Sequence, residues 1–465
     1  MSVQTLTHSF ADFETTAVRR PRRTFIRGRL DEFWPLTLYF YLYPLWWVLG
    51  LSKLIIFFMA VPMLVSLVRH HDLRVPRGFG FYLLFLMWFG LGVTMLWVQA
   101  PGTDPKHGLG PLIGFTFRIL WYASVTIACL YVLNADRTRL TAVRLGRMLA
   151  FLFLITISGG LLGLAMPTLD FPSLLELGLP KGAMKTEFLN TIFHPRVVLN
   201  SEFLGYSQPR VTAPFSYPNT WGNAVGLLLP FFIATWFGRA AGWRRFVSPF
   251  ILLLAVVPIV YSLNRGLWLG LAVSVTWVTV RRLWAGDFRA LIAATAAVMT
   301  VAGALLLTPL GQTITTRLAT PQSDDRRQDT ATEVIRSTWD ASPILGYGGT
   351  RNMVANFNSL AGGNPECHQC SAPPLGTQGF LWGLIFMTGF VGAVLLVGFL
   401  MTQFWINMRV PTTLGLVTST VVLASVFYFL FYDSLDVPML VTMMAIGLSA
   451  REHSPPPLPP PQGVT

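Results

Sequence analysis

The stretch GTQGFLWGLIFMTGFVGAVLLVGFLMTQFWI, from Gly376 to Ile406, contains no charged residue. A helix needs about 20 consecutive apolar residues to cross the roughly 30 Å hydrocarbon core of a bilayer, and this stretch exceeds that length. A helix is also one of the few structures that satisfies its own backbone hydrogen bonds inside lipid. The stretch therefore predicts a membrane-spanning helix.

Apolar stretches of this kind recur from Phe33 to Ala450. Of the 465 residues, 53% are hydrophobic and 12% are charged, roughly half the charged fraction of a soluble domain. The pattern predicts an all-α protein, a polytopic transmembrane helical bundle with about twelve spans in one membrane domain over residues 34–450. The predicted spans cover residues 34–50, 54–68, 78–99, 113–133, 148–166, 220–237, 247–263, 266–280, 290–310, 376–406, 412–431 and 437–450.

The distribution of arginine predicts the orientation of this bundle. With both termini in the cytoplasm, every short cytoplasmic connection carries at least one arginine, as in 69–77, 137–147 and 281–289. This is the bias that the positive-inside rule describes. The parity of all later spans depends on the first two, which have to turn near Ser52 and Lys53.

Two long connections fall on the outer side in this orientation, 167–219 and 311–375, the second between spans nine and ten. Long connections often carry function. The ends 1–33 and 451–465 are expected to be disordered cytoplasmic segments, the first basic and the second proline-rich. The pI of about 10.1 does not indicate nucleic-acid binding, because no soluble domain remains on which a basic groove could form.

Thirteen basic residues face outward or lie near the outer ends of spans in this orientation, against the charge rule, and three arginines among them stand out. Arg118 lies about one turn inside the fourth span, where an ionisable side chain is costly, although it could also snorkel to the headgroups. Arg210 precedes the sixth span in QPRVTAPFSYPNTWG, where Asn219 or Thr220 could cap the helix. Arg265 lies in YSLNRGLWLGL, where two spans meet with almost no connection. A guanidinium matches phosphate oxygens, so the ligand is either a lipid-linked diphosphate or an ordinary headgroup phosphate.

The 311–375 connection contains a helical charge pattern. Glu333, Arg336 and Asp340 recur at helical spacing, which favours an exposed amphipathic helix with internal charge pairs. The SPILGYGG segment that follows predicts a glycine-rich turn.

No cofactor is indicated by the sequence. It contains no G-x-x-x-x-G-K-[ST] loop for ATP and no clear divalent metal site. Cys367 and Cys370 in ECHQC would need more ligands than His368 adds to bind a metal, so we expect a local disulfide or two thiols there. The chemistry is therefore predicted to be independent of metal ions.

Four segments, in this order along the chain, resemble elements of the O-antigen ligase and O-antigen polymerase family. RVTAPFSYPN is similar to the family's arginine, aromatic and Pro-Asn element, and SLNRG to its Ser-Arg-Gly element. SPILGYG resembles the His-Pro-x-x-Gly-x-Gly element of the large loop, and QGFLWGLIFMTGFVG resembles the re-entrant helix that ends in paired glycines. The resemblance covers about residues 210–392.

The resemblance implies a membrane glycosyltransferase of the bacterial inner membrane. Such an enzyme transfers or polymerises a glycan from a polyprenyl diphosphate carrier to the hydroxyl of a glycan or glycolipid acceptor. The reaction would take place on the periplasmic side of the membrane, and membrane lipids would surround the protein. By resemblance, Arg210 and Arg265 would bind the diphosphate, and Arg336 and Arg118 are further candidates for binding it. They would stabilise the charge that develops as it departs.

The base that activates the acceptor is less well matched. Many ligases of the family begin the re-entrant helix with a histidine, and Gln378 stands at this position here. Because glutamine cannot act as a general base, His368 or Glu366 would replace that histidine, or the acceptor would be activated in another way.

Two other functions would use similar residues. A transporter or flippase of a lipid-linked glycan would bind the same diphosphate without breaking a bond, although the internal repeats common in transporters are not apparent. A peptidoglycan-type glycosyltransferase would rely on an acidic residue of the large loop, which contains Asp324, Asp325, Asp329, Glu333 and Asp340.

Overall fold

The computed structural model describes residues 31–69, 72–180, 182–201, 208–238, 241–289, 322–353 and 374–453, together with 291–292, 295–296 and 299. Several sequence predictions lie outside these residues. They concern both chain ends, most of the predicted ninth span at 290–310, and the side chains of Glu366, Cys367, His368 and Cys370.

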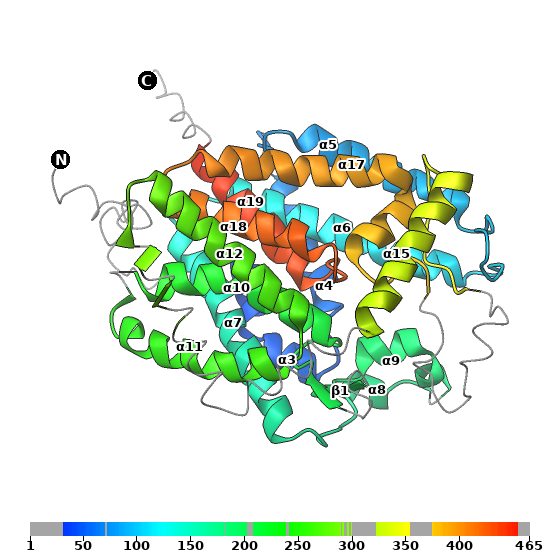
Figure 1. Ribbon diagram of the computed structural model, residues 1–465, viewed down its shortest axis with the longest axis horizontal. Coiled ribbons are helices and arrows are strands. Elements are labelled where there is room, and N and C mark those ends of the chain that lie inside the picture. Colours follow the sequence, from blue (N-terminus) through cyan, green and yellow to red (C-terminus); the bar gives the residue numbers. More distant parts are fainter. Residues whose placement is uncertain are drawn as a thin grey trace.

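The described chain is mostly helical (Figure 1). Besides the helices it contains one antiparallel hairpin, β1 Val198–Ser201 with β2 Gln208–Val211. The helices are α2 Trp34–Tyr41, α3 Tyr43–Val48, α4 Ile55–Val68, α5 Phe79–Leu91, η1 Gly92–Met95, α6 Gly110–Asn134, α7 Ala142–Ala165, α8 Leu174–Leu177, η2 Ala183–Lys185, α9 Glu187–Phe193, α10 Pro218–Trp236, α11 Arg244–Tyr261, α12 Arg265–Trp284, α15 Gln322–Ala341, α17 Phe380–Met408, α18 Thr413–Tyr428 and α19 Val437–His453.

The predicted spans coincide closely with these helices, apart from 290–310. The first predicted span is divided into α2 and α3 at Leu42, because Pro44 begins a second helix there. The chain then turns through Gly50, which has a positive φ of 79°, and through Lys53 before α4 begins. The third predicted span, 78–99, consists of α5 followed directly by the 3-10 helix η1.

The helices have the apolar character of membrane spans. Among the described residues, four helices are long and apolar enough to cross a membrane: α6, α7, α11 and α17. Three helical segments are apolar but shorter: α4, α5 together with η1, and α18. Large apolar side chains also cover the outside of the bundle, including Phe58 at 62% exposure, Phe250 at 72% and Val394 at 69%. Contiguous exposure of this kind is costly in water and favourable in lipid. The chain is a membrane protein.

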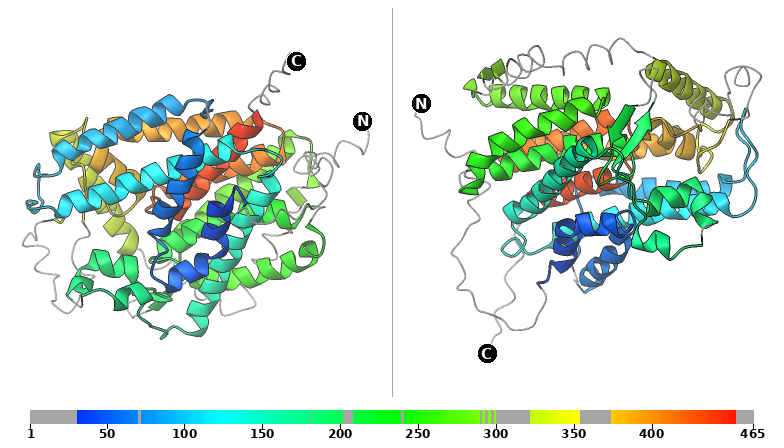
Figure 2. Two further views of the ribbon diagram at one scale, coloured as in Figure 1. Left: turned by 180° about the vertical axis from the view of Figure 1, so that it is seen from behind. Right: turned by 90° about the horizontal axis from the view of Figure 1, so that it is seen from below.

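The helix α19 lies at the centre of the bundle. Its side chains from Val437 to Ser449 are all buried, and α6 and α18 pack against it. Small residues allow these close approaches: a Cβ atom on Gly447 would lie 2.4 Å from the carbonyl oxygen of Cys129, the buried free cysteine of α6. The view from behind in Figure 2 shows α5 alongside α17 at the edge of this core.

The helix α17 is broken at Gly389, which has φ 66° and ψ −178°. The break frees backbone groups, and the SPILGYG segment pairs with them: Tyr347 N donates to Phe386 O at 2.8 Å, and Phe390 N donates to Pro343 O at 2.9 Å. Figure 1 shows the shorter arm of α17 beside α15. The SPILGYG segment and the broken part of α17 are therefore held together by backbone hydrogen bonds.

Candidate functional site

The connection between α18 and α19, residues 429–436, carries Tyr432, Asp433, Ser434 and Asp436. These residues form hydrogen bonds or electrostatic interactions with polar side chains from other segments at the same end of the bundle. We call the side chains of Tyr432, Asn264, Arg210 and Arg327 the Tyr432 cluster, and those of Asp436, Asp433 and Lys53 the Asp436 cluster.

The Tyr432 cluster is centred on one buried hydrogen bond. The hydroxyl of Tyr432 donates to Oδ1 of Asn264, and Nδ2 of Asn264 donates to the backbone oxygen of Pro218 at 3.1 Å. Two glycines make room for these side chains: a Cβ on Gly222 would lie 2.4 Å from Asn264 Nδ2, and one on Gly266 would lie 2.6 Å from the Tyr432 hydroxyl. The Pro-Asn element and the SLNRG element are therefore parts of a single contact.

The β hairpin places Arg210 in this contact. Arg210 lies on β2 opposite Leu199 of β1, and only 5% of its surface is exposed. Its Nε atom donates a hydrogen bond to the backbone oxygen of Ser262 at 2.9 Å. Ser262 directly follows α11, so this bond ties the hairpin to the turn that leads into α12.

Arg265 begins α12 and is partly buried. The backbone before it is strained, because Leu263 has a φ of 54°, in the left-handed region that bulky residues rarely adopt. Such strain persists only where the surroundings hold it, and it gathers at functional sites. Here the Tyr432–Asn264 and Arg210–Ser262 hydrogen bonds hold the turn on both sides of Leu263.

Arg327 on α15 is the third arginine of this region. Burial raises the pKa of Tyr432, while the positive charges of Arg327 and Arg210 act in the opposite direction. Guanidinium groups from two separate elements thus lie within electrostatic range of one hydroxyl. Positive charges brought together at a partly enclosed surface create a potential that attracts anions.

The Asp436 cluster adds two carboxyl groups and an amine. Burial raises the pKa of the Asp436 carboxyl; Lys53 opposes this shift and Asp433 adds to it. Burial lowers the pKa of Lys53, against the negative charges of Asp436 and Asp433. The ammonium of Lys53 also lies 5.4 Å from the ring centre of Tyr217, within the range of a cation–π contact. Asp433 itself is exposed, so its carboxylate can reach a ligand.

Two asparagines of α10 face this connection. Asn223 donates from Nδ2 to the Ser434 hydroxyl at 2.9 Å, and its buried Oδ1 has no hydrogen-bond partner among the described residues. Asn219 does not cap α10, since the helix begins at Pro218 with Tyr217 in the N-cap position, and in the same part of the chain its buried Oδ1 has no partner either. An unsatisfied buried oxygen costs free energy, which a hydrogen-bond donor from a ligand would recover.

No family model matches this chain, and no curated protein and no solved structure matches it.

The structure separates the arginines predicted to bind diphosphate. It brings Arg210 to the Tyr432 cluster and places Arg265 directly after Asn264. Arg118 on α6 lies farther along the same end, and both it and Asp433 are within electrostatic range of the buried Tyr122 hydroxyl. Arg336 is different: its side chain is 76% exposed and pairs with Asp340 at 4.0 Å, as the amphipathic-helix interpretation of this segment predicts.

Of the three residues predicted to activate the acceptor, His368 and Glu366 lie outside the described residues. Gln378 is partly buried just before α17. Its neighbour Phe380 donates a backbone hydrogen bond to Tyr432 O at 2.8 Å. The start of α17 is therefore in contact with the connection that carries both clusters.

Sequence analysis did not identify Tyr432, Asp433, Asp436 or Arg327 as site residues. One signal was present: the segment YDSLD places two acidic residues between two uncharged, apolar spans, where ionisable side chains are expensive and usually functional. Arg327 carries no comparable signal, because it stands in a charged segment that resembles a solvated helix face.

His194, in the connection between α9 and β1, is structural. His194 contacts Glu176 Oε2 through Nδ1 at 2.8 Å and Asp170 Oδ1 through Nε2 at 2.7 Å. It joins α8 and the segment before it to the end of α9. Arg351 is likewise structural, since its buried guanidinium donates to backbone oxygens that include Leu96 O at 2.8 Å and Tyr347 O at 2.9 Å.

Proposed function

We propose that this chain is a membrane glycosyltransferase that transfers or polymerises a glycan from a polyprenyl diphosphate carrier to an acceptor hydroxyl. One observation carries the proposal. The positive charges of Arg210 and Arg327 lie within electrostatic range of the Tyr432 hydroxyl. This hydroxyl donates a hydrogen bond to Asn264, the residue before Arg265. Two guanidinium groups, from β2 and α15, therefore lie near one connection, and Arg265 at the start of α12 directly follows a residue bonded to it.

A diphosphate is the anion that this arrangement suits best. Each arginine offers a planar set of donors that matches phosphate oxygens, and separate arginines can bind the two phosphates. The Arg210 side chain is fixed before the ligand arrives, because its Nε donates to the Ser262 carbonyl, and the backbone turn before Arg265 is held by the Tyr432–Asn264 hydrogen bond. Preorganised positive charge stabilises a leaving group as its negative charge develops.

The reaction is a displacement at the anomeric carbon of the donor glycan. The acceptor oxygen forms the new bond to this carbon, and the bond from the carbon to the diphosphate breaks. The bonding electrons leave with the diphosphate, whose charge Arg210, Arg265 and Arg327 neutralise. The acceptor proton passes to a base. His368 and Glu366 remain candidates for this base, and the exposed Asp433 is a further one, because it lies on the connection that carries Tyr432.

The two ends of the bundle support a topology in which the clusters face the periplasm. At one end Lys53 makes a cation–π contact with Tyr217, and Arg210 donates a hydrogen bond to the Ser262 carbonyl. At the other end Asn134 accepts from Arg74 N at 2.8 Å, and Arg281 donates to Val410 O at 2.8 Å. The second end carries the arginine-rich connections, which the positive-inside rule assigns to the cytoplasm. We propose about twelve spans in the bacterial inner membrane, both termini cytoplasmic, and a large outer loop between spans nine and ten.

The proposal is tested with purified protein in proteoliposomes that contain a polyprenyl diphosphate-linked glycan and an acceptor glycolipid. We expect transfer or elongation of the glycan by the unaltered protein, and loss of this product in the variants Arg210→Ala and Arg265→Ala. The variant Arg139→Ala is the control, because Arg139 pairs with Glu32 at 2.9 Å at the other end of the bundle. Movement of an unchanged substrate across the bilayer would instead identify a transporter.

A further inference from the structure

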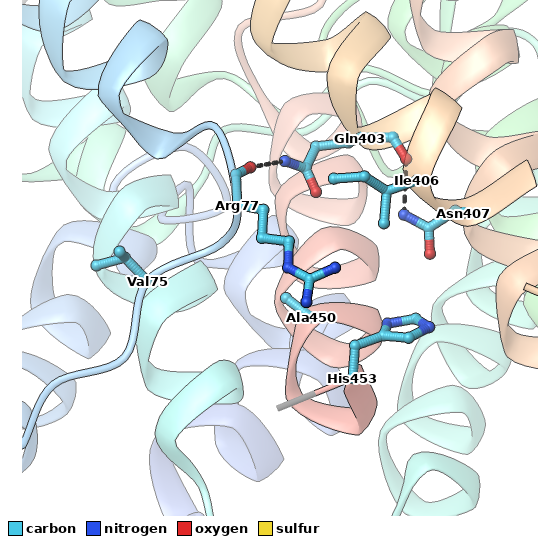
Figure 3. Close-up of a pocket in the computed structure, with 7 residues that line it drawn as sticks. All are labelled: Val75, Arg77, Gln403, Ile406, Asn407, Ala450 and His453. Carbon is cyan, nitrogen blue, oxygen red and sulfur yellow. Dashed lines mark hydrogen bonds between the residues drawn. The ribbon is translucent and has the colours of Figure 1, made fainter. Parts of the chain in front are cut away.

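A polar pocket lies at the opposite end of the bundle from the two clusters. α17 and α19 both begin beside the Tyr432 connection and run from it to this pocket. It is formed by the connection before α5 and by the last turns of α17 and α19, with Arg77, Gln403, Asn407 and His453 among its lining (Figure 3). The cavity has a volume of about 40 Å³, room for a group of about three water-sized atoms.

The pocket is positively charged. Figure 3 shows the Arg77 guanidinium between the side chains of Gln403 and His453. Within the described part of the chain this guanidinium has no ion pair and no hydrogen-bond acceptor, and no acidic side chain lines the cavity. His453 contacts the backbone oxygen of Ser449 through Nδ1 at 2.7 Å. Because a carbonyl oxygen only accepts, Nδ1 carries the proton of this bond and Nε2 is left for another partner.

Buried amides fix the shape of the pocket. Gln403, only 2% exposed, donates from Nε2 to the backbone oxygen of Arg77 at 2.6 Å. Asn407, also 2% exposed, donates from Nδ2 to Gln403 O at 2.8 Å, and its Oδ1 accepts from the Ser449 hydroxyl. A connected buried network of this kind rigidifies its surroundings, so the backbone of Arg77 is held in place before any ligand binds.

The surroundings of the pocket are those of a membrane surface. Trp405, 53% exposed on α17, lies under the Arg409 guanidinium at 4.8 Å, and Trp243 and Arg244 make a similar contact at 5.8 Å. Exposed tryptophan and arginine at helix ends are typical of the headgroup region. Val75, at 54% exposure, adds an apolar edge to the pocket.

We propose that this pocket binds the phosphate of an anionic lipid headgroup. The Arg77 guanidinium donates to the phosphate oxygens, and Nε2 of His453 donates to them when the ring is protonated. The network from Gln403 to Ser449 holds the Arg77 backbone and the His453 ring beside the cavity. The site is separate from the Tyr432 cluster, and the lipid bound there is a ligand and not the substrate.

The test measures the thermal unfolding of the full-length protein in a neutral detergent. Short-chain phosphatidylglycerol, short-chain phosphatidylcholine and glycerol phosphate are titrated separately. We expect saturable stabilisation by phosphatidylglycerol alone. In Arg77→Gln its apparent affinity should fall about fivefold. The matched control Arg409→Gln removes one charge from the same end, outside the pocket lining, and should bind as the unaltered protein does.

Three outcomes would overturn the proposal. Equal weakening in Arg409→Gln would mean that lipid binds to the positive surface as a whole. Equal stabilisation by glycerol phosphate would identify a site for soluble phosphate compounds. A lower melting temperature in Arg77→Gln with unchanged lipid affinity would mean that Arg77 only balances the carbonyl ends of α17 and α19. Glycan transfer is not measured, so none of these outcomes depends on the proposed function.

Discussion

The hydroxyl of Tyr432 donates a hydrogen bond to the side-chain oxygen of Asn264, across 168 residues of sequence. Both side chains are buried. The bond joins the connection between α18 and α19 to the turn between α11 and α12, and so positions Arg265 relative to both clusters. Four predictions follow from this architecture.

Tyr432→Phe removes the hydroxyl and keeps the ring. Asn264 then has a buried oxygen without a donor, which costs about 1–3 kcal/mol. We expect a lower melting temperature and a loss of glycan transfer, because the strained turn at Leu263 is no longer held. Thermal unfolding and the proteoliposome assay measure the two effects. The variant Tyr41→Phe, which alters an exposed tyrosine of α2, is the control. Unchanged stability in Tyr432→Phe would contradict a structural role for the bond.

Arg210→Lys keeps the positive charge and removes the planar fork. The guanidinium of Arg210 can donate to the Ser262 carbonyl from Nε and still present its other two nitrogens to a phosphate. A lysine ammonium lacks this planar arrangement of donors. We expect glycan transfer to fall by about 10²-fold or more, the scale of losing one preorganised donor. The matched variant Arg139→Lys makes the same change at the other end of the bundle and should retain full transfer. Retained transfer in Arg210→Lys would show that charge alone suffices at this position.

The Asp436 carboxyl gives the stability a defined pH dependence. Burial raises its pKa in the folded protein, so the folded state binds the proton more tightly than the unfolded chain. The stability that this provides is complete below the unfolded pKa of about 3.9 and is lost as the pH rises through the folded pKa. The melting temperature of Asp436→Asn, relative to that of the unaltered protein, should therefore increase as the pH is raised from about 4.

Lys53→Met provides the control for this titration. Lys53 lowers the pKa of Asp436 in the folded protein, so its removal should extend the pH dependence to higher pH. A difference between Asp436→Asn and the unaltered protein that stays constant across this range would mean that Asp436 does not titrate in the folded state as proposed.

The break in α17 should be sensitive to a single methyl group. Gly389 has a positive φ, and a Cβ atom there would lie 2.2 Å from the Ile344 carbonyl oxygen. Gly389→Ala should destabilise the protein by more than the roughly 1–2 kcal/mol cost of a left-handed backbone. Gly398 lies in the same helix with no atom within 4 Å of an added Cβ, so Gly398→Ala should stabilise it by about 0.5–1 kcal/mol. Thermal unfolding of both variants distinguishes a fixed break from a flexible one.

Much of the helical architecture could be predicted from the sequence. Spans 220–237 and 412–431 coincide with α10 and α18 to within a few residues, because the length and apolarity of a span are local properties that a bilayer imposes on each segment alone. The division of the first predicted span into α2 and α3 was missed, although Pro44 marked it. The amphipathic pattern around Arg336 was sufficient to predict an exposed helix.

The candidate site could be predicted only in part. Arg210 and Arg265 stood out because they are charged residues next to apolar spans, on the side predicted to be non-cytoplasmic, where arginine is uncommon. Their partners Arg327 and Tyr432 did not, because neither the charged segment before α15 nor a tyrosine at a helix end is unusual in sequence. Their roles depend on which connections meet, and that is decided by the packing of α10, α12, α18 and α19 around one another.

The sequence by itself thus determined that the chain is helical, that it belongs in a membrane, and where most of its helices begin and end. These properties follow from hydrophobicity and length, residue by residue. Only the tertiary structure decided that Asn264 accepts a hydrogen bond from Tyr432, that the SPILGYG segment packs against Gly389, and that Arg77 lines an open polar pocket. Contacts between residues far apart in the chain depend on the packing of whole helices, which no local pattern encodes.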